Sequence, residues 1–349
     1  MYIGNSEIEK LYIGEDEVDK LYLGTDLIYE KSSGPDYRTM PLTFEILSGG
    51  TICWKANNSA YTVTLEYSKN GGEWTSITSN TDTSAPTIIV ESGDKVQFRG
   101  NNATLATNSK NYNTFSGSTC GFKVKGNIMS LLYKDSFAAA TTLQTACTFS
   151  NLFYNCTGLT DASELVLPAT TLANRCYYAM FQDCISLTSA PSVLPATTLT
   201  NSCYNSMFYR CRSLTTALSI LPATTLAENC YEGMFGGCQN LTSAPSILPA
   251  TTLANSCYSS MFEGCTLLTT APELPATTLP KNCYNTMFNK CTNLNYIKCL
   301  ATDISAFFCT NNWVNGVAST GTFVKDATMT SWPSGASGIP TGWTVQDNV

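Results

Sequence analysis

The C-terminal half of the chain repeats one pattern of apolar and polar positions with a nearly fixed period. The motif Cys-Tyr-x-x-Met-Phe-x-x-Cys occurs five times, and Leu-Pro-Ala-Thr-Thr-Leu precedes each copy. The copies begin at Cys176, Cys203, Cys230, Cys257 and Cys283, so the period is 27, 27, 27 and then 26 residues. Periods of about 20 to 50 residues are typical of units that bury their apolar faces only by stacking on one another.

The spacing within one repeat predicts a short helix. Four apolar residues lie four positions apart, namely Leu199, Cys203, Met207 and Cys211. This spacing matches one face of a helix, and Thr197 and Thr198 can cap its first turn. Residues 214–217 predict a short extended stretch that ends before Pro222. Each repeat is therefore expected to contain a short strand and a helical turn, which is the plan of a leucine-rich-repeat solenoid.

The segment before the repeats predicts an all-β structure. Strand-like runs separated by turn clusters occur at residues 62–67, 86–90, 95–98 and 121–126. Short strands at this spacing are typical of a small immunoglobulin-like sandwich. Residues 32–37 include Ser-Ser-Gly-Pro-Asp and predict a linker on its N-terminal side.

The first 31 residues carry a second repeat, ten residues long. The recurring apolar positions of this repeat are Tyr2, Ile8, Tyr12, Val18, Tyr22 and Ile28. They predict short strands separated by turns. Eight acidic residues against three lysines place about five (8 − 3) of the seven net negative charges here. A segment this small is not stable alone, so these six residues are candidate docking residues against other copies or a partner. The alternative is a meander folded onto the next domain.

Composition excludes several kinds of chemistry. The chain has 349 residues, no histidine, 16 cysteines and a net charge of −7. Without histidine there is no Ser-His-Asp or Cys-His triad and no zinc site that uses imidazole. The acidic balance argues against a nucleic-acid groove. Because the acidic residues of the repeats are dispersed, with no paired-carboxylate motif, we expect no catalytic residues, no cofactor, no metal and no enzymatic activity.

The N-terminus and the cysteines bear on the compartment. The N-terminal segment has acidic residues where a signal peptide has a basic region and an apolar run, and no stretch is apolar enough for a membrane span. Cysteines of an unexported protein are usually thiols, and buried thiols behave as small apolar groups. Disulfides between equivalent cysteines of adjacent repeats, about 5 Å apart, are an alternative. The chain has no Cys-x-x-Cys pair, which argues against zinc.

The segment Met-Phe-x-x-Cys-x-x-Leu-Thr-x-Ala-Pro-x-x-Leu-Pro resembles the BspA-type leucine-rich repeat over roughly residues 147–300. The phenylalanine of that pattern is matched by Phe181, Phe208, Phe235, Phe262 and Phe288, and its cysteine by Cys184, Cys211, Cys238, Cys265 and Cys291. The repeats here are longer and carry a second column of cysteines. The resemblance implies a surface protein of the kind that gut and oral bacteria use for adhesion, with similar repeats in their phages.

Positions that differ between repeats are the candidate binding positions, since an exposed column can change without disturbing the core. Two such positions follow the phenylalanine of each repeat, and another follows its second cysteine. The candidate partner-binding residues are Gln182, Asp183, Tyr209, Arg210, Arg212, Glu263, Asn289 and Lys290. The tyrosine after the leading cysteine is identical in all five copies, which indicates repeated packing; a sugar-binding ladder is the alternative.

The sequence thus predicts a multidomain, β-rich chain. Its parts are a docking or oligomerisation segment (1–31), a linker (32–37), a β-sandwich spacer (38–135), a solenoid (136–310) and a C-terminal cap (311–349). We expect a non-enzymatic virion attachment protein, a phage fibre or decoration protein, that presents the repeats to a host-surface glycan or protein. A bacterial cell-surface adhesin and a purely structural virion component are the alternatives. A fibre implies a homo-oligomer, here a trimer, with residues 1–36 contacting virion proteins, no nucleic-acid partner and no membrane insertion.

Overall fold

The computed structural model describes residues 2–3, 6–7, 12–13, 16–17, 20–23, 26–30, 36–81 and 84–348. The chain divides into two compact units, Met1–Asp36 and Tyr37–Val349. Each unit is described by itself.

In the first unit, each ten-residue repeat contributes one antiparallel pair of strands. The pairs are β1 (Tyr2–Ile3) with β2 (Ser6–Glu7), β3 (Tyr12–Ile13) with β4 (Asp16–Glu17), and β5 (Lys20–Leu23) with β6 (Asp26–Glu30). Of the candidate docking residues, Tyr2, Tyr12, Tyr22 and Ile28 lie in these strands, whereas Ile8 and Val18 lie outside the described residues.

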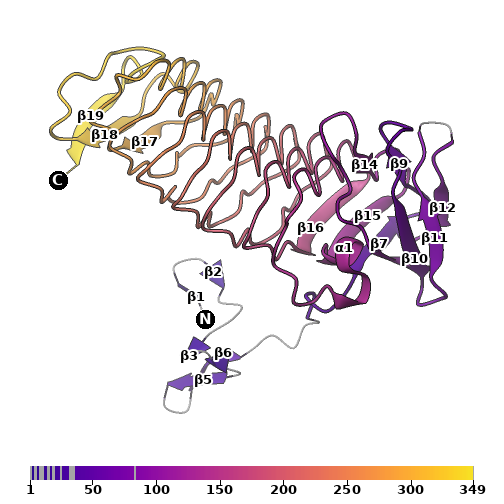
Figure 1. Ribbon diagram of the computed structural model, residues 1–349. Helices are drawn as coiled ribbons and strands as arrows, with labels where there is room; N and C mark the ends of the chain where they lie inside the picture. The colour runs from indigo at the N-terminus through magenta and orange to yellow at the C-terminus, as the bar shows by residue number, and fades with distance from the viewer. Residues whose placement is uncertain are drawn as a thin grey trace. The chain divides into compact units, whose positions relative to one another are not determined.

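The second unit begins with a six-stranded sheet (Figure 1). In spatial order its strands are β11 (Thr75–Thr78), β10 (Thr64–Lys69), β13 (Lys95–Arg99), β7 (Leu42–Ser48), β15 (Gly121–Asn127) and β16 (Leu159–Val166). The first five strands pair antiparallel, but β15 pairs parallel with β16. Since β16 belongs to the first, degenerate repeat, the sheet continues directly into the repeats.

Two small sheets and two short helical segments complete this β-rich part. The sheets are β8 (Gly50–Cys53) with β12 (Thr87–Val90), and β9 (Lys55–Ala56) with β14 (Asn113–Thr114). The helical segments are α1 (Ser130–Tyr133) and η2 (Lys134–Ser136). No helix among the described residues has the length and apolar character that a membrane span requires.

Alternating side chains of the central strands build the core of the β-rich part. On β7, Leu42, Phe44 and Ile46 are buried on one face, as expected for strand periodicity. The ring of Phe44 stacks on that of Phe122 with 4.6 Å between centroids. Trp54 is fully buried, and its indole nitrogen donates a hydrogen bond to the carbonyl of Val63 at 2.9 Å. The indole nitrogen of a buried tryptophan usually has such a partner.

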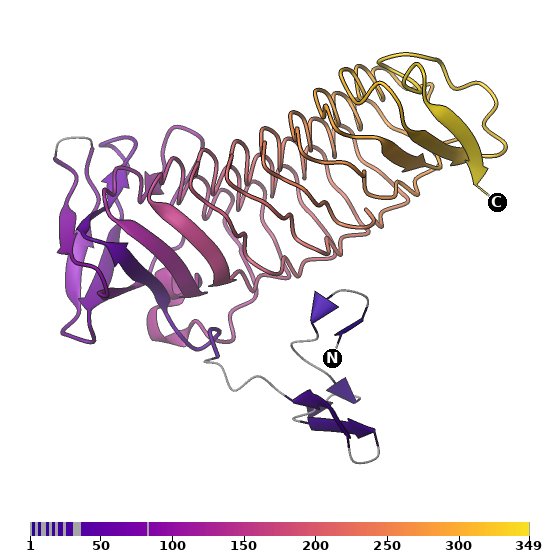
Figure 2. The same cartoon turned by 180° about the vertical axis from the view of Figure 1, so that it is seen from behind.

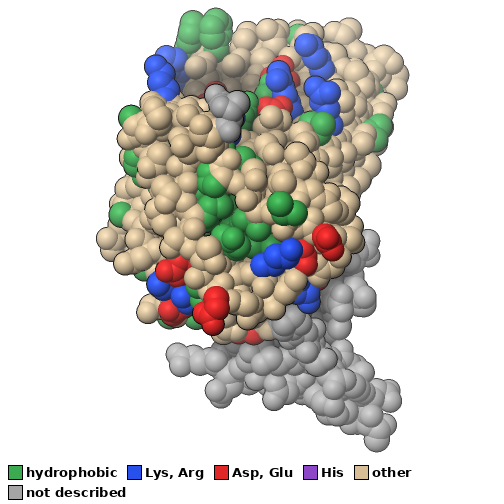
Figure 3. Space-filling model, turned by 90° about the vertical axis from the view of Figure 1, so that its right-hand side faces the viewer, with side chains coloured by type: hydrophobic (Ala, Val, Ile, Leu, Met, Phe, Trp, Pro, Cys, Tyr) green, Lys and Arg blue, Asp and Glu red, His purple; other side chains and the backbone are tan. Residues whose placement is uncertain are grey.

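Charged side chains pair at the surface of the β-rich part. Arg99 donates to Glu66 at 2.7 Å and to Asp135 at 2.6 Å, and its guanidinium lies 4.0 Å from the centroid of the Trp74 ring. Lys134 also contacts Glu66 at 2.8 Å. On the side of the second unit that Figure 3 shows, acidic and basic side chains lie close together near the edges, while hydrophobic side chains gather near the centre.

The repeats follow one another from β16 to β17 as successive coils of chain (Figures 1 and 2). Backbone hydrogen bonds in each coil alternate between two kinds of acceptor. The amide nitrogens of Tyr204, Ser206 and Phe208 donate to carbonyls of the next repeat at 2.8–3.0 Å. The intervening Asn205 and Met207 donate to the carbonyls three residues earlier, both at 3.2 Å. Every second amide therefore links adjacent repeats, and the period of the sequence is the register of these bonds.

A left-handed backbone conformation recurs at every fourth residue of the coils. In one repeat Ser202, Ser206 and Arg210 have φ of 55°, 56° and 60°. The same three positions are left-handed in the other coils, and Gly233, Gly237 and Gly264 hold some of them. An α-helix needs φ near −63° throughout and bonds to the carbonyl four residues earlier. Such a helix cannot contain these positions.

The predicted fold class, a sandwich followed by a leucine-rich-repeat solenoid with a strand and a helical turn per unit, is therefore wrong. In the described residues, the repeats contain turns and isolated bridges instead of helices, and the sheets of the protein are separate. Thr197 and Thr198 consequently cap no helix. The four-residue spacing of the buried side chains reflects a turn that ends in a left-handed residue, after which the next buried pair begins.

Two parallel ladders of aromatic rings fill the interior of the coils. One runs Phe149, Tyr177, Tyr204, Tyr231, Tyr258 and Tyr284, and the other runs Phe153, Phe181, Phe208, Phe235, Phe262 and Phe288. Neighbouring rings are 5.2–6.2 Å apart. All these rings are buried, so the prediction that the identical tyrosines serve packing is confirmed.

The two ladders end on one tryptophan. The Trp313 ring lies 6.0 Å from that of Tyr284 and 6.2 Å from that of Phe288, and it stacks on Trp332 at 5.7 Å. Beside it, β17 (Tyr296–Cys299), β18 (Thr322–Asp326) and β19 (Thr344–Asn348) form a parallel sheet. The C-terminal segment thus closes the apolar interior at the last coil.

Candidate binding surface

The variable positions that follow the phenylalanine of each repeat form a column across the coils, here called the variable ridge. It consists of residues 182–183, 209–210, 236–237, 263–264 and 289–290. The amide of Asp183 donates to the carbonyl of Tyr209, that of Arg210 to Gly236, and that of Gly237 to Glu263. The same bonds continue from Gly264 to Asn289. The ridge therefore places the candidate binding residues of four repeats in one column, in which Gly236 and Gly237 of the third repeat separate Tyr209 and Arg210 from Glu263. Arg212 lies one position beyond the adjacent buried cysteine.

The predicted residues differ in how far they reach solvent. Arg210, Arg212 and Lys290 are exposed. Gln182, Asp183, Tyr209 and Glu263 are half-buried, and Asn289 is buried. The side chain of Asn289 donates to the Glu263 carboxylate at 2.8 Å and accepts from the Asn315 amide at 3.1 Å. Asn289 and Glu263 thus connect three coils, whereas the cationic side chains are available to a partner.

Glycines of one repeat make room for the large side chains of the repeat before it. A Cβ on Gly236 would lie 2.9 Å from Cδ2 of Tyr209, and one on Gly237 would lie 3.1 Å from Cγ of Arg210. The Arg210 guanidinium lies 5.0 Å from the centroid of the Tyr209 ring. Tyr209 and Arg210 therefore form the bulkiest part of the ridge, and a cation over a tyrosine ring is itself stabilising.

The tyrosine column is closed to ligands. Tyr177, Tyr204 and Tyr231 are each 1% exposed, and their hydroxyls have no hydrogen-bond partner within the described structure. Burial raises the pKa of each hydroxyl well above its usual value. Because the rings face the interior of the coils, a sugar-binding ladder on these tyrosines is ruled out.

We expect Tyr204→Phe to leave the free energy of unfolding unchanged or to raise it by up to about 1 kcal/mol, because a buried hydroxyl without a partner is costly. The chain itself has Phe149 at the equivalent position of its first repeat. Urea denaturation measures the change, and Tyr204→Ala, which removes the whole ring, is the destabilising control. A loss above about 1 kcal/mol in Tyr204→Phe would show that the hydroxyl has a partner.

The cysteine side chains pack in the interior of the protein. All sixteen are buried free thiols. The second cysteine of a repeat donates from Sγ to the phenylalanine carbonyl of the previous repeat, as in Cys184 to Phe153 at 3.0 Å and Cys211 to Phe181 at 3.0 Å. Burial raises the pKa of Cys184 to about 12, so the thiol stays protonated and keeps donating. The described residues contain no cluster of cysteine and acidic side chains suited to a metal ion.

One half-buried carboxylate makes the repeats sensitive to pH. Asn205 donates to Oε2 of Glu232 at 2.9 Å, yet burial raises the pKa of Glu232 above its usual value. The folded chain therefore binds this proton more tightly than the unfolded chain does. The resulting stabilisation is present below the unfolded pKa, about 4.3, and is lost as pH rises through the higher folded pKa.

Glu232→Gln is accordingly expected to raise the melting temperature at neutral pH, because the amide oxygen still accepts from Asn205 without the buried charge. It is also expected to flatten the dependence of melting temperature on pH above about 4.3, the pKa of an unfolded glutamate. Calorimetry at several pH values measures both effects, with the exposed Glu228→Gln as control. A lower melting temperature at pH 7 than that of the unmodified chain would contradict the assigned direction.

Sequence reasoning missed the exposed apolar residues. Val193, Ile220 and Ile247 occupy one column of three adjacent repeats and all face solvent. The sequence does indicate their exposure, because each of them directly precedes the buried leucine of a Leu-Pro pair and therefore faces the opposite way. Phe307 and Phe308 are also exposed, and their rings lie 3.9 Å apart. These two residues break the repeat pattern near the end of the predicted solenoid, residues 136–310.

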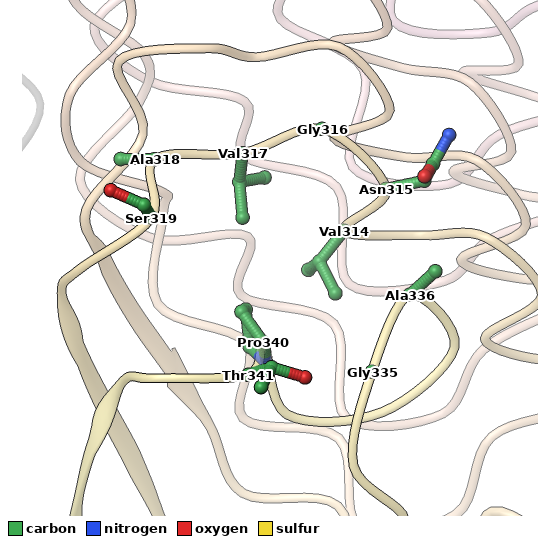
Figure 4. Close-up of a pocket in the computed structure, with 10 residues that line it drawn as sticks. All are labelled: Val314, Asn315, Gly316, Val317, Ala318, Ser319, Gly335, Ala336, Pro340 and Thr341. Atoms are coloured by element: carbon green, nitrogen blue, oxygen red, sulfur yellow. The ribbon is translucent and has the colours of Figure 1, made fainter.

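A small pocket near the C-terminus offers little chemistry. Its volume is about 190 Å³, and its lining includes Val314, Val317, Pro340 and Thr341 (Figure 4). The figure shows Val314, Val317 and Pro340 pointing toward one another across it, and no charged side chain lines it. Pockets for drug-sized ligands usually exceed about 300 Å³. The exposed columns are therefore the better candidates for a binding surface.

No protein-family model, curated protein or solved structure matches the chain.

Proposed function

We propose that this chain is a non-enzymatic virion attachment protein that presents the exposed columns of its repeats to a receptor on a host surface. Residues 1–36 join it to virion proteins and to other copies of the chain, with a trimer as the expected assembly. The resemblance of the Met-Phe-x-x-Cys segment to BspA-type repeats, which occur in adhesins and in phages, supports both the virion location and the adhesive role.

The observation that carries the proposal is the division between identical and variable columns. Inside the coils, Cys, Tyr, Met, Phe and Cys are repeated without change, and their rings and backbone bonds connect every repeat to the next. Outside, the ridge varies from Asp183 to Arg210 to Gly237. An identical interior combined with a variable ridge is typical of proteins in which stacked repeats present a binding face.

Two measurements test the proposal. Particles purified from a lysate that carries this gene are expected to contain the chain by mass spectrometry. Fluorescently labelled full-length protein is expected to bind some members of a panel of gut and oral bacteria, and unlabelled protein should compete. If the chain is absent from particles and binds no cell, the proposed function is wrong. Presence in particles without cell binding would favour the structural component instead.

A further inference from the structure

Two adjacent phenylalanines lie exposed on the surface of the last coil. Phe307 is 63% exposed and Phe308 is 52% exposed. Their ring centroids are 3.9 Å apart at an interplanar angle of 28°. Single exposed apolar residues are common, whereas a contiguous aromatic pair in solvent is informative. Neither ring contributes to the buried core.

Both phenylalanines occupy columns that are polar in the preceding repeats. Backbone bonds between coils align Phe307 with Asn174, Asn201, Glu228, Asn255 and Lys281. The next column aligns Phe308 with Arg175, Ser202, Asn229, Ser256 and Asn282. The repeat itself therefore requires no aromatic ring at either position.

Phe308 also has a backbone conformation that is unfavourable for a bulky side chain. Its φ is 56°, in the left-handed region that bulky residues rarely adopt and that asparagine tolerates. Asn229 and Asn282 hold the same conformation at φ of 55° and 57°. An exposed aromatic that holds this conformation and lies outside the buried core indicates a functional requirement.

We propose that Phe307 and Phe308 form the stacking platform of a saccharide-binding site, with the polar residues of the preceding coils as its hydrogen-bonding side. The inference rests on the proposed function, because it names the chemistry of the host receptor. One face of a pyranose ring carries mainly C–H groups and packs on aromatic rings, while its hydroxyls need donors and acceptors at the rim. The backbone amide of Asn282 donates a hydrogen bond to the Phe307 carbonyl at 3.2 Å, so the polar residues of the preceding coil lie directly beside the two rings.

The surroundings favour a sugar over a protein partner. Exposed Lys281 and Asn255 and half-buried Asn282 supply ammonium and amide groups in adjacent coils. Adjacent hydrogen-bonded strands lie about 4.8 Å apart, which is close to the length of one sugar residue. A protein interface of ordinary size needs about 800 Å² per partner with an apolar centre. Two rings flanked by polar side chains provide a smaller apolar area than that.

The test restores the polar pattern of the earlier repeats. In the full chain, F307N/F308N places asparagine where Asn201, Asn255, Asn229 and Asn282 already occur. We expect its melting temperature to equal or exceed that of the unmodified chain, because the left-handed strain is relieved. The probe is a printed array of mammalian and bacterial glycans, followed by titration of the best-bound oligosaccharide. Its affinity should fall about tenfold or more, whereas Ile89→Asn, which removes an exposed apolar residue of the β-rich part outside the repeats, should leave it unchanged.

The outcomes separate this inference from the proposed function. If the unmodified chain binds host cells but F307N/F308N binds the cells and the array equally well, the inference is wrong and the function stands. An empty array with cell binding that F307N/F308N does not reduce has the same meaning. A change in oligomeric state of the variant by light scattering, with unchanged glycan binding, would assign the platform to self-association and overturn the inference. Absence of cell binding by the unmodified chain argues against the proposed function instead.

Discussion

Replacing Phe208 by alanine is expected to lower the free energy of unfolding by about 3–5 kcal/mol. The ring lies 5.3 Å from that of Phe181 and 5.6 Å from that of Phe235, and it is fully buried. Its removal leaves a cavity between three coils that are joined by backbone bonds every second residue. The neighbouring repeats cannot move closer to fill this space, because the same bonds fix their separation.

Urea denaturation of Phe208→Ala measures this loss. The matched control is Ile220→Ala in the same repeat, which removes an apolar side chain that is 68% exposed and is expected to change stability by less than about 0.5 kcal/mol. Phe208→Leu should fall between the two. Equal effects of Phe208→Ala and Ile220→Ala would contradict the position of Phe208 in a packed ladder.

Trp313→Ala is expected to lower the free energy of unfolding by a similar amount, about 3–5 kcal/mol. Unlike the effect of Phe208→Ala, its effect should be concentrated at the C-terminal end of the repeats. Trp313 contacts the last rings of both ladders, and its indole nitrogen donates to the Gly338 carbonyl at 2.8 Å. Its loss exposes Tyr284 and Phe288 to solvent. Repeat arrays depend on such terminal caps for solubility, so the variant should also associate through its open end.

Hydrogen exchange followed by mass spectrometry locates the effect of Trp313→Ala. Faster exchange is expected at residues 283–300 and 313–345, with little change in the β-rich part near Phe44. Trp313→Phe, which retains a ring but loses the hydrogen bond, should show a smaller change. Uniformly faster exchange along the whole unit would show that the C-terminal segment does not act as a local cap.

The sequence predicted the core of the repeats well, because identical residues at a fixed period have one simple physical explanation. Cys203, Tyr204, Met207, Phe208 and Cys211 are all buried. Where the period is 27 residues, the bonds between coils run from an amide to the carbonyl 26 residues later, and this register places residues one period apart side by side. Stacking identical units places identical side chains in contact. The interior columns could therefore be recognised without any knowledge of the backbone conformation.

The helical conformation predicted for each coil is wrong, and the spacing of the apolar positions itself argues against a helix. In an α-helix, apolar positions alternate between three and four residues apart, because each residue turns about 100°. Three successive steps of four residues, from Leu199 to Cys211, drift by roughly 120° around a helix and leave one face. A second signal for the left-handed positions is that small or polar residues occupy several of them, including Ser202, Ser206 and Gly237. Arg210 and Phe308 are large residues at left-handed positions, so they do not fit this pattern.

The binding surface could be predicted only in part. Variation between repeats identified Arg210, Arg212 and Lys290, which are exposed, but the same reasoning selected Asn289, which is buried between its neighbours. A side chain that varies in type can still bond to the next repeat, and the sequence does not distinguish these cases. Phe307 and Phe308 were overlooked because they fall after the last recognisable motif, where alignment with earlier repeats needs the backbone bonds.

Removal of one whole repeat tests most directly the claim that the period is the register of the coils. Deletion of residues 203–229 joins Ser202 to Cys230 and places Tyr177 beside Tyr231, with every column in phase. We expect this variant to unfold cooperatively, within about 10 °C of the full chain in thermal denaturation. Deletion of residues 203–215, although shorter, takes every later column out of phase and should abolish cooperative unfolding. If the 27-residue deletion unfolds the chain as completely as the 13-residue deletion does, the coils are not in the register described.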